Sequence, residues 1–212
     1  SSSRWLVCPG SVKLCEGLTD EDSVYSREGT FAHSIAAAAL NEGKELSDYL
    51  GTKCENNEFQ VDREMIEHLA VYVDFVNELL LVGSASRVWI EQKVRIADDL
   101  YGTADVMILS ADGKTLDVAD LKYGAGKFVV VEGNTQARTY AVAACETFAD
   151  ELLHVETVRI HVVQPRHRDG DPIFGQIPRA FEAMRYHSLI AGAASLPSCF
   201  RITAKTWDET IM

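Results

Sequence analysis

The chain has 212 residues, of which 47% are hydrophobic and 25% charged, and its formal net charge is −12. These values suit one globular domain and exclude a wholly disordered chain. The negative charge argues against a broadly basic surface, so cations that contact a nucleic acid would have to be concentrated locally. The sequence has no run of about 18 apolar residues and no apolar stretch of a signal peptide near its start. We therefore expect no membrane contact and a cytoplasmic location.

Two helices are predicted in the first part of the chain. The first spans about residues 26–40, with Ser26 as the candidate N-cap and Gly43 as the end. After a polar loop, a second helix begins at its cap, Asp62, and carries apolar residues at helical spacing until Gly83.

Alternation of apolar and polar residues then predicts three strands joined by short turns. The strands cover residues 87–96, about 101–110 and 115 to about 123. An Asp-Gly turn joins the second strand to the third, which indicates an antiparallel meander.

A helix and a fourth strand are expected after the meander. Residues 127–132 are predicted to form a short extension, and Asn134 caps a helix that runs to about Phe148. Residues 155–164 are rich in β-branched side chains and are expected to join the sheet in parallel, because the connection is a helical crossover. The last predicted elements are a polar loop over residues 165–172 and a helix over residues 178–195.

This order of elements predicts a mixed α/β layer structure. We find no internal repeat and no convincing domain boundary, so we expect a single domain over residues 1–212. Its parts are an N-terminal helical part (1–83), a core sheet with its crossover helix (84–165) and a C-terminal helix and tail (166–212).

Three charged residues on the predicted hairpin are candidates for chemistry. Asp105 lies on the second strand, and Asp120 and Lys122 lie two residues apart on the third, so the latter pair shares one face. If Asp105 points to that face too, two carboxylates converge beside an amine. Such a site suits Mg²⁺, which acidifies a bound water, while the amine stabilises charge on phosphate. The alternative is a solvated hairpin, although charges among apolar strand residues need partners.

Residues on two helices can complete this site. His33 lies on the first helix, and imidazole binds ions of the Mn²⁺ type. Gln136 and Tyr140 are four residues apart on the later helix, so they share a face that can look toward the strand ends. The alternatives are a core or surface histidine and a pair that only packs on the sheet.

Together these residues resemble the RecB-type branch of the PD-(D/E)XK nuclease superfamily. The resemblance spans roughly residues 5–165 and is nearest to an uncharacterised phage-associated set. Members of that set open with Arg-Trp-Leu-x-Cys-Pro-Gly-Ser, as residues 4–11 do, and carry Gln-Pro-Arg after the last core strand, as residues 164–166 do. The motifs, in the family's order, are Gly29-Thr30-x-x-His33, Gly102-Thr103-Ala104-Asp105, Asp120-Leu121-Lys122-Tyr123-Gly124 and Gln136-x-x-x-Tyr140.

The resemblance implies a restriction-endonuclease-like fold and a Mg²⁺- or Mn²⁺-dependent deoxyribonuclease. It further implies an exonuclease that acts on linear DNA ends in phage recombination or replication, with a phage recombination protein as a partner and the cytoplasm of a bacterial host as its location. The implied metal ligands are His33, Asp105, Asp120 and the Leu121 carbonyl; Lys122 is implied to be catalytic, and Gln136 and Tyr140 to support the site or contact DNA.

Two features depart from the family pattern. Many relatives hold a [4Fe–4S] cluster with four cysteines, but only Cys8 and Cys199 lie in suitable parts of this chain, so a complete iron–sulfur cluster is not expected. Some relatives place an acid one helical turn after the histidine, where this chain has Ala37. A non-catalytic nuclease-fold module that binds DNA ends or a partner protein therefore stays open, as does, with less support, an acidic mimic of nucleic acid. The cations that could line the sheet are Lys93, Arg95, Lys122, Lys127, Arg138, Arg166 and Arg168.

Overall fold

The computed structural model describes residues 8, 10, 23–82, 84–97, 100–124, 128–131 and 134–166. The predicted helix over residues 178–195, and the predicted loop beyond residue 166, lie outside these residues. None of the described helices has the length and apolar character needed to cross a membrane. The elements are α3 (Val24–Glu42), η1 (Leu46–Tyr49), α4 (Arg63–Val82), β1 (Arg87–Ala97), β2 (Leu100–Leu109), β3 (Thr115–Leu121), α5 (Thr135–Thr147) and β4 (Thr157–Val163).

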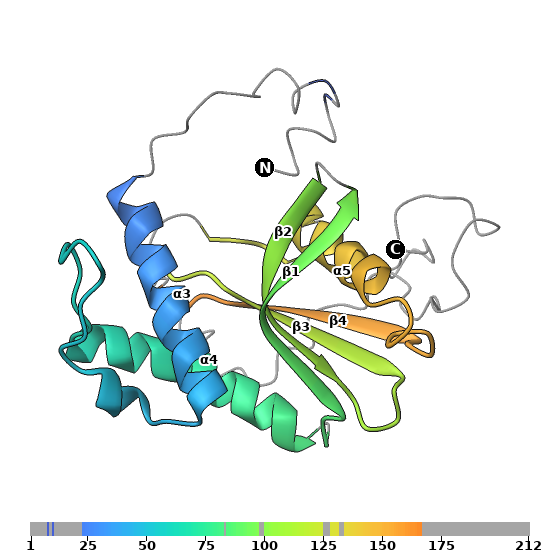
Figure 1. Cartoon of the computed structure of the whole chain (residues 1–212), viewed down its shortest axis with the longest axis horizontal. Helices are drawn as coiled ribbons and strands as arrows, with labels where there is room; N and C mark the ends of the chain where they lie inside the picture. The colour runs from blue at the N-terminus through green and yellow to red at the C-terminus, as the bar shows by residue number, and fades with distance from the viewer. Residues whose placement is uncertain are drawn as a thin grey trace.

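The four strands form one mixed sheet in the order β1-β2-β3-β4 (Figure 1). The β1–β2 and β2–β3 pairs are antiparallel, and β4 pairs in parallel with β3 after the crossover through α5. This confirms the predicted α/β class, the meander and the parallel fourth strand. A parallel strand cannot be reached by a tight turn, which is why the crossover helix stands between β3 and β4.

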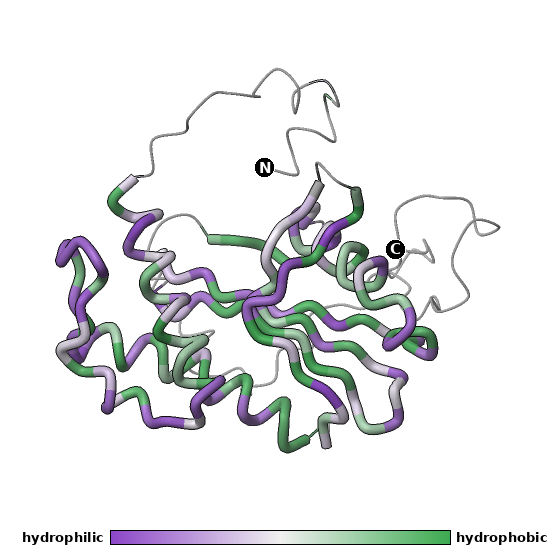
Figure 2. Tube along the Cα trace, in the orientation of Figure 1, coloured by the Kyte–Doolittle hydropathy of each residue, from purple (hydrophilic) through white to green (hydrophobic). Residues whose placement is uncertain are grey.

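Helices cover both faces of the sheet (Figure 1). Helices α3 and α4 pack on one face, here called the α3/α4 face, and α5 packs on the other, the α5 face. Hydrophobic residues run along the middle strands, whereas hydrophilic residues gather in the segment between α3 and α4 (Figure 2). The α3/α4 face carries Val106, Ile108, Ala119, Leu121 and Tyr123. The α5 face carries Ala104, Met107, Leu109, Leu116 and Val118.

Side-chain caps fix where the helices begin. Asp62 Oδ1 accepts a hydrogen bond from the Met65 backbone N–H at 2.8 Å, and Asn134 caps α5 as predicted. The prediction of Ser26 as the first N-cap is wrong, because Ser23 takes that role and Ser26 donates its backbone N–H to the Ser23 hydroxyl. The helix therefore starts earlier than expected, and it ends, as predicted, at Gly43 in the left-handed conformation.

The predicted extension over residues 127–132 is wrong for residues 128–131, which form no strand. At Val129 the hydrogen-bond partner is a side chain instead of a neighbouring strand. The Gln164 amide accepts from the Val129 N–H at 3.0 Å and donates to the Val129 carbonyl at 2.9 Å. Alternating sequence alone does not distinguish these two kinds of partner.

Candidate metal centre

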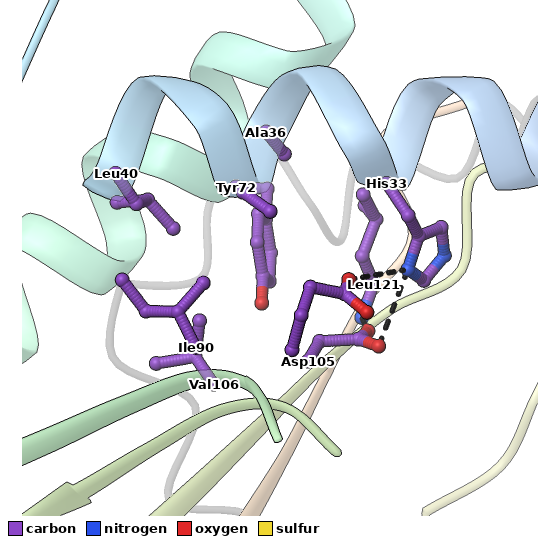
Figure 3. Close-up of a pocket in the computed structure, with 10 residues that line it drawn as sticks. His33, Ala36, Leu40, Tyr72, Ile90, Asp105, Val106 and Leu121 are labelled. Atoms are coloured by element: carbon purple, nitrogen blue, oxygen red, sulfur yellow. Dashed lines mark hydrogen bonds and ion pairs between the residues drawn. The ribbon is translucent and has the colours of Figure 1, made fainter. Parts of the chain in front are cut away.

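Three side chains from three elements converge between α3 and the sheet. The His33 Nδ1 atom on α3 lies 3.2 Å from Asp105 Oδ1 on β2 and 3.8 Å from Glu91 Oε1 on β1 (Figure 3). The potential ligand atoms of the three residues all lie within 4.8 Å of one another. A cation with ligand bonds of about 2.1 Å places its ligands roughly 3 to 4.2 Å apart, so the set fits a small divalent ion after slight adjustment.

A break in strand alternation builds this set. In a regular strand, neighbours point to opposite faces, yet Ile90 and Glu91 both line the small cavity under α3, and so do Asp105 and Val106. The β1–β2 register passes from the Ile90 pairing to the next one without pairing Glu91 or Asp105. Glu91 has a φ of 48°, in the left-handed region that non-glycine residues avoid. The local strain turns both carboxylates toward His33.

The charges of this cluster favour a bound cation. Burial would lower the pKa of His33, but hydrogen bonds and charges from Asp105 and Glu91 outweigh it and raise the pKa to about 10. The imidazole is therefore held as a cation between two carboxylates. A divalent ion would supply the same compensating charge, and its binding would require the neutral imidazole.

Backbone contacts hold Asp105 in place. Its Oδ2 atom accepts a hydrogen bond of 2.7 Å from the backbone N–H of Leu121, beyond the last regular β2–β3 pair. Beneath it the buried hydroxyl of Tyr72 donates to the Ala119 carbonyl at 3.3 Å, which ties α4 to β3. The Asp105 side chain is only 11% exposed, so the carboxylate is anchored at one oxygen and turned to His33 with the other.

Asp120 and Lys122 form a pair, as the two-residue spacing predicts. Lys122 Nζ lies 2.6 Å from Asp120 Oδ2. Burial and the charge of Asp105 raise the pKa of Asp120, although Lys122 and His33 act in the opposite direction. Asp120 is thus close enough to sense the cluster electrostatically, but its oxygens are not part of the ligand set within 4.8 Å.

The sequence set a condition, that Asp105 share a face with Asp120 and Lys122, and the structure brings Asp105 and Lys122 together in the lining of the outer pocket. Val118 lies on the α5 face, whereas Ala119 and Leu121 lie on the α3/α4 face, so alternation places Asp120 on the α5 side. Asp105 points to the α3 side because of the break in alternation described above. Asp105 nevertheless lies next to Asp120, because its carboxylate accepts a hydrogen bond from the backbone N–H of Leu121, the residue between Asp120 and Lys122.

Gln136 and Tyr140 share one face of α5, as expected, with Gln136 Nε2 3.3 Å from the Tyr140 hydroxyl. Tyr140 packs directly on Gly102 of β2. A methyl group at Gly102 would lie 2.4 Å from Tyr140 Cε1, so the first residue of the Gly-Thr-Ala-Asp motif has to be glycine for this contact. Neither α5 residue lines the two cavities beside His33. Tyr140 therefore seats α5 on the sheet, while Gln136 is exposed and contacts the Tyr140 hydroxyl.

Two cavities meet at the cluster. The inner one is small and is lined mainly by apolar residues such as Leu40, Tyr72 and Ile90 (Figure 3). The outer one is an open pocket of about 580 Å³. His33, Glu91 and Asp105 line both, and Lys122 lines the outer one. The candidate ligands therefore stand at the inner wall of a solvent-accessible pocket, with an amine beside them.

Glu91 is the residue that sequence reasoning missed. In the alternating pattern of β1 it looks like one more polar residue on the exposed face. Its signal lies in the hairpin register, which sets Glu91 across from Asp105 between two paired positions. Like charges opposite each other in a strand pair repel, so such a pair suggests a compensating cation.

Comparison with known families gives a family but no activity. Residues 1–174 match the family described as "Protein of unknown function (DUF2800)". The chain belongs to this family.

Curated proteins with a different description are also similar to parts of the chain. The aminodeoxychorismate/anthranilate synthase component 2 of Bacillus subtilis is 30% identical over 148 residues, which is 68% of this chain and 72% of that protein. The anthranilate synthase component 2 of Methanothermobacter thermautotrophicus is 40% identical over 57 residues, covering 27% of this chain and 29% of the relative. That of Azospirillum brasilense is 42% identical over 55 residues, covering 23% and 28%. The chain thus spans less than a third of the last two relatives.

Proposed function

We propose that this chain is a divalent-metal-dependent deoxyribonuclease with a restriction-endonuclease-like fold. The observation that carries the proposal is the convergence of His33, Glu91 and Asp105 at the inner wall of an open pocket. One imidazole and two carboxylates are suitable ligands for Mg²⁺ or Mn²⁺. The mixed sheet, with an antiparallel meander and a parallel fourth strand, is consistent with the fold that the sequence motifs imply.

Glu91 offsets one departure from the family pattern. Some relatives carry an acid one helical turn after the histidine, where this chain has Ala37. Ala37 lines the inner cavity together with His33 and Glu91, so the carboxylate comes from β1, across the cavity from the helix. Glu91 therefore supplies the carboxylate that those relatives carry on the helix, and the number of candidate metal ligands is the same.

The chain's own residues divide the remaining work. A bound divalent ion would acidify a water and offset charge on the scissile phosphate. Lys122 faces the same pocket and can stabilise the negative charge that develops on phosphate oxygens. Asp120 holds the Lys122 amine at 2.6 Å and so positions it. A direct bond from Asp120 to the ion, as the resemblance implies, requires its carboxylate to leave Lys122.

The test measures cleavage and ion binding separately. The full-length chain is incubated with linear DNA and Mn²⁺, with and without EDTA, and Mn²⁺ affinity is measured by calorimetry. We expect cleavage that EDTA abolishes, and loss of both cleavage and Mn²⁺ binding in Asp105→Asn. Asp74→Asn removes an exposed acid on α4 and is the matched control. Equal product in all lanes, EDTA included, would contradict the proposal.

An Asp120→Asn variant separates the two roles of that residue. If Asp120 positions Lys122, cleavage falls while Mn²⁺ affinity stays close to that of the parent. If affinity falls as far as in Asp105→Asn, Asp120 is a ligand, as the resemblance implies. Ion binding by the parent without any cleavage would favour the non-catalytic module that binds DNA ends or a partner protein.

The finer assignment, an exonuclease acting at linear ends in phage recombination or replication, rests on the sequence resemblance alone. The 148-residue match to the Bacillus subtilis protein favours a second candidate, a component of an aminodeoxychorismate or anthranilate synthase. This second candidate gives the His33–Glu91–Asp105 cluster no role, so we place it after the nuclease. Formation of either product by the chain together with a synthase component 1 would support it.

A further inference from the structure

The outer pocket beside the metal ligands has a wall that two side chains hold in place. Gln164 fixes the segment around Val129 by its two hydrogen bonds to that backbone. Arg166 lies 3.0 Å from Glu28 of α3 and stacks 4.8 Å above the ring of Tyr123, which follows β3. The Gln-Pro-Arg motif therefore joins α3, the end of β3 and the 128–131 segment, and the pocket is largely preformed.

The lining of this pocket is poor in positive charge. Among the described lining residues its cations are Lys122 and the protonated His33, and the latter is already neutralised by the two acids Glu91 and Asp105. Arg166, at the edge of the pocket, already pairs with Glu28, and Lys93 stacks over Tyr101 on the hairpin. Proteins that grip duplex DNA neutralise several phosphates at once. The chain has a net charge of −12, and the lining of this pocket has too few cations to neutralise several phosphates of a duplex.

The pocket offers aromatic and hydroxyl groups instead. Tyr25 on the first turn of α3 lines it and is 77% exposed, and Ser26, Thr30 and Thr103 contribute hydroxyl groups. Single-strand-binding proteins gain much of their affinity from bases that stack on such rings, and they need fewer charges to do so. A volume of about 580 Å³ falls in the range of pockets that hold one small ligand, about the size of one or two nucleotides.

We infer that the outer pocket binds an unpaired DNA strand, with one base stacked on Tyr25 and the adjoining phosphate directed to the His33–Glu91–Asp105 cluster. This inference rests on the proposed function, since DNA is taken from it as the ligand. Bases inside a duplex cannot stack on the Tyr25 ring, because neighbouring base pairs cover both of their faces.

The test measures binding, without any need for cleavage. Fluorescence anisotropy of the full-length chain is recorded with a labelled 12-nucleotide single strand and with the matching duplex, in Ca²⁺ and in the cold, and a gel checks that the DNA stays intact. We expect the single strand to bind more tightly than the duplex. Tyr25→Ala should weaken single-strand binding about 5- to 150-fold, and Tyr25→Trp should restore it.

Tyr101→Ala is the matched control, because Tyr101 is also an exposed tyrosine (62%) but lies outside the pocket lining. It should leave single-strand binding within about twofold. Equal affinity for duplex and single strand, or equal losses in the Tyr25 and Tyr101 variants, would overturn the inference. A single-strand preference that depends on Tyr25, in a protein that cleaves nothing, would uphold it and refute the hydrolytic proposal. Cleavage that needs Mn²⁺, together with single-strand binding that is indifferent to Tyr25, would uphold the hydrolytic proposal and refute the inference.

Discussion

Glu91, the strained residue of the candidate metal centre, should behave oppositely to an ordinary strand residue when it is replaced by glycine. Glu91 has a φ of 48°, a conformation that costs an L-residue about 1–2 kcal/mol but costs glycine nothing in steric terms. Glycine loses about 0.5–1 kcal/mol in backbone entropy on folding. Without metal, Glu91→Gly should therefore change the free energy of unfolding by about 0 to +1.5 kcal/mol, toward greater stability.

Other contacts of Glu91 alter this balance little. Its carboxylate is 36% exposed and lies 3.8 Å from His33 Nδ1, so it raises the pKa of His33 less than Asp105 does at 3.2 Å. Removing it also removes repulsion with Asp105. Gln92→Gly is the matched control, because Gln92 pairs regularly with Ala104 and has no left-handed backbone. It should lose at least about 0.5–1 kcal/mol.

Thermal unfolding in EDTA compares the variants. For a chain of this size about 1 kcal/mol moves Tm by roughly 2–4 °C, so Glu91→Gly should unfold at the parent's Tm or up to about 6 °C above it. With Mn²⁺ at 100 times its Kd, the parent should gain about 2.7 kcal/mol and the variant much less. If Glu91→Gly loses as much stability in EDTA as Gln92→Gly, Glu91 is not strained and the carboxylates are not held toward His33 at the expense of the fold.

Two further predictions concern packing and pH. Gly102→Ala should lower the free energy of unfolding by about 1–3 kcal/mol, because the added methyl group meets the Tyr140 ring. Gly124→Ala, which has open space for the methyl group, should be neutral in the same thermal unfolding assay. In a Tyr140→Ala background, Gly102→Ala should no longer be destabilising. Burial would raise the pKa of Asp117, but hydrogen bonds from His161 and an arginine lower it overall. Its stabilisation is therefore complete above the unfolded pKa of about 3.9 and is lost as pH falls through the lower folded pKa. Urea titrations should show Asp117→Asn to be less stable by about 1–3 kcal/mol at pH 7, with the difference shrinking below pH 4; a difference independent of pH would contradict this.

Local signals in the sequence were enough for most of the described fold. Asp62 and Asn134 are side chains whose capping role depends only on residues two or three positions away. Period-two alternation found the strands, and the helical crossover required the fourth strand to be parallel. The short-range spacing of Asp120 and Lys122, and of Gln136 and Tyr140, likewise predicted the contacts that the structure shows.

Apart from the N-cap of α3, which is Ser23 and not Ser26, the prediction failed where a partner far away in the chain decides the outcome. The segment around Val129 is not a strand because the Gln164 side chain, 35 residues later, satisfies its backbone. Such a partner leaves no trace in the local pattern.

By itself the sequence determined the class of fold, the order of elements and the chemical types available to the site, because these follow from local periodicity and composition. Only the tertiary structure decided which acids face His33. Alternation assigns Glu91 and Asp105 to the α5 side, yet a break in alternation at this unpaired position, where Glu91 has a left-handed backbone, turns them to the α3 side. Such a break reverses the direction of the side chains that follow it at a backbone cost of about 1–2 kcal/mol, and burial of residues from distant elements on the two faces offsets that cost, so no local pattern can predict it.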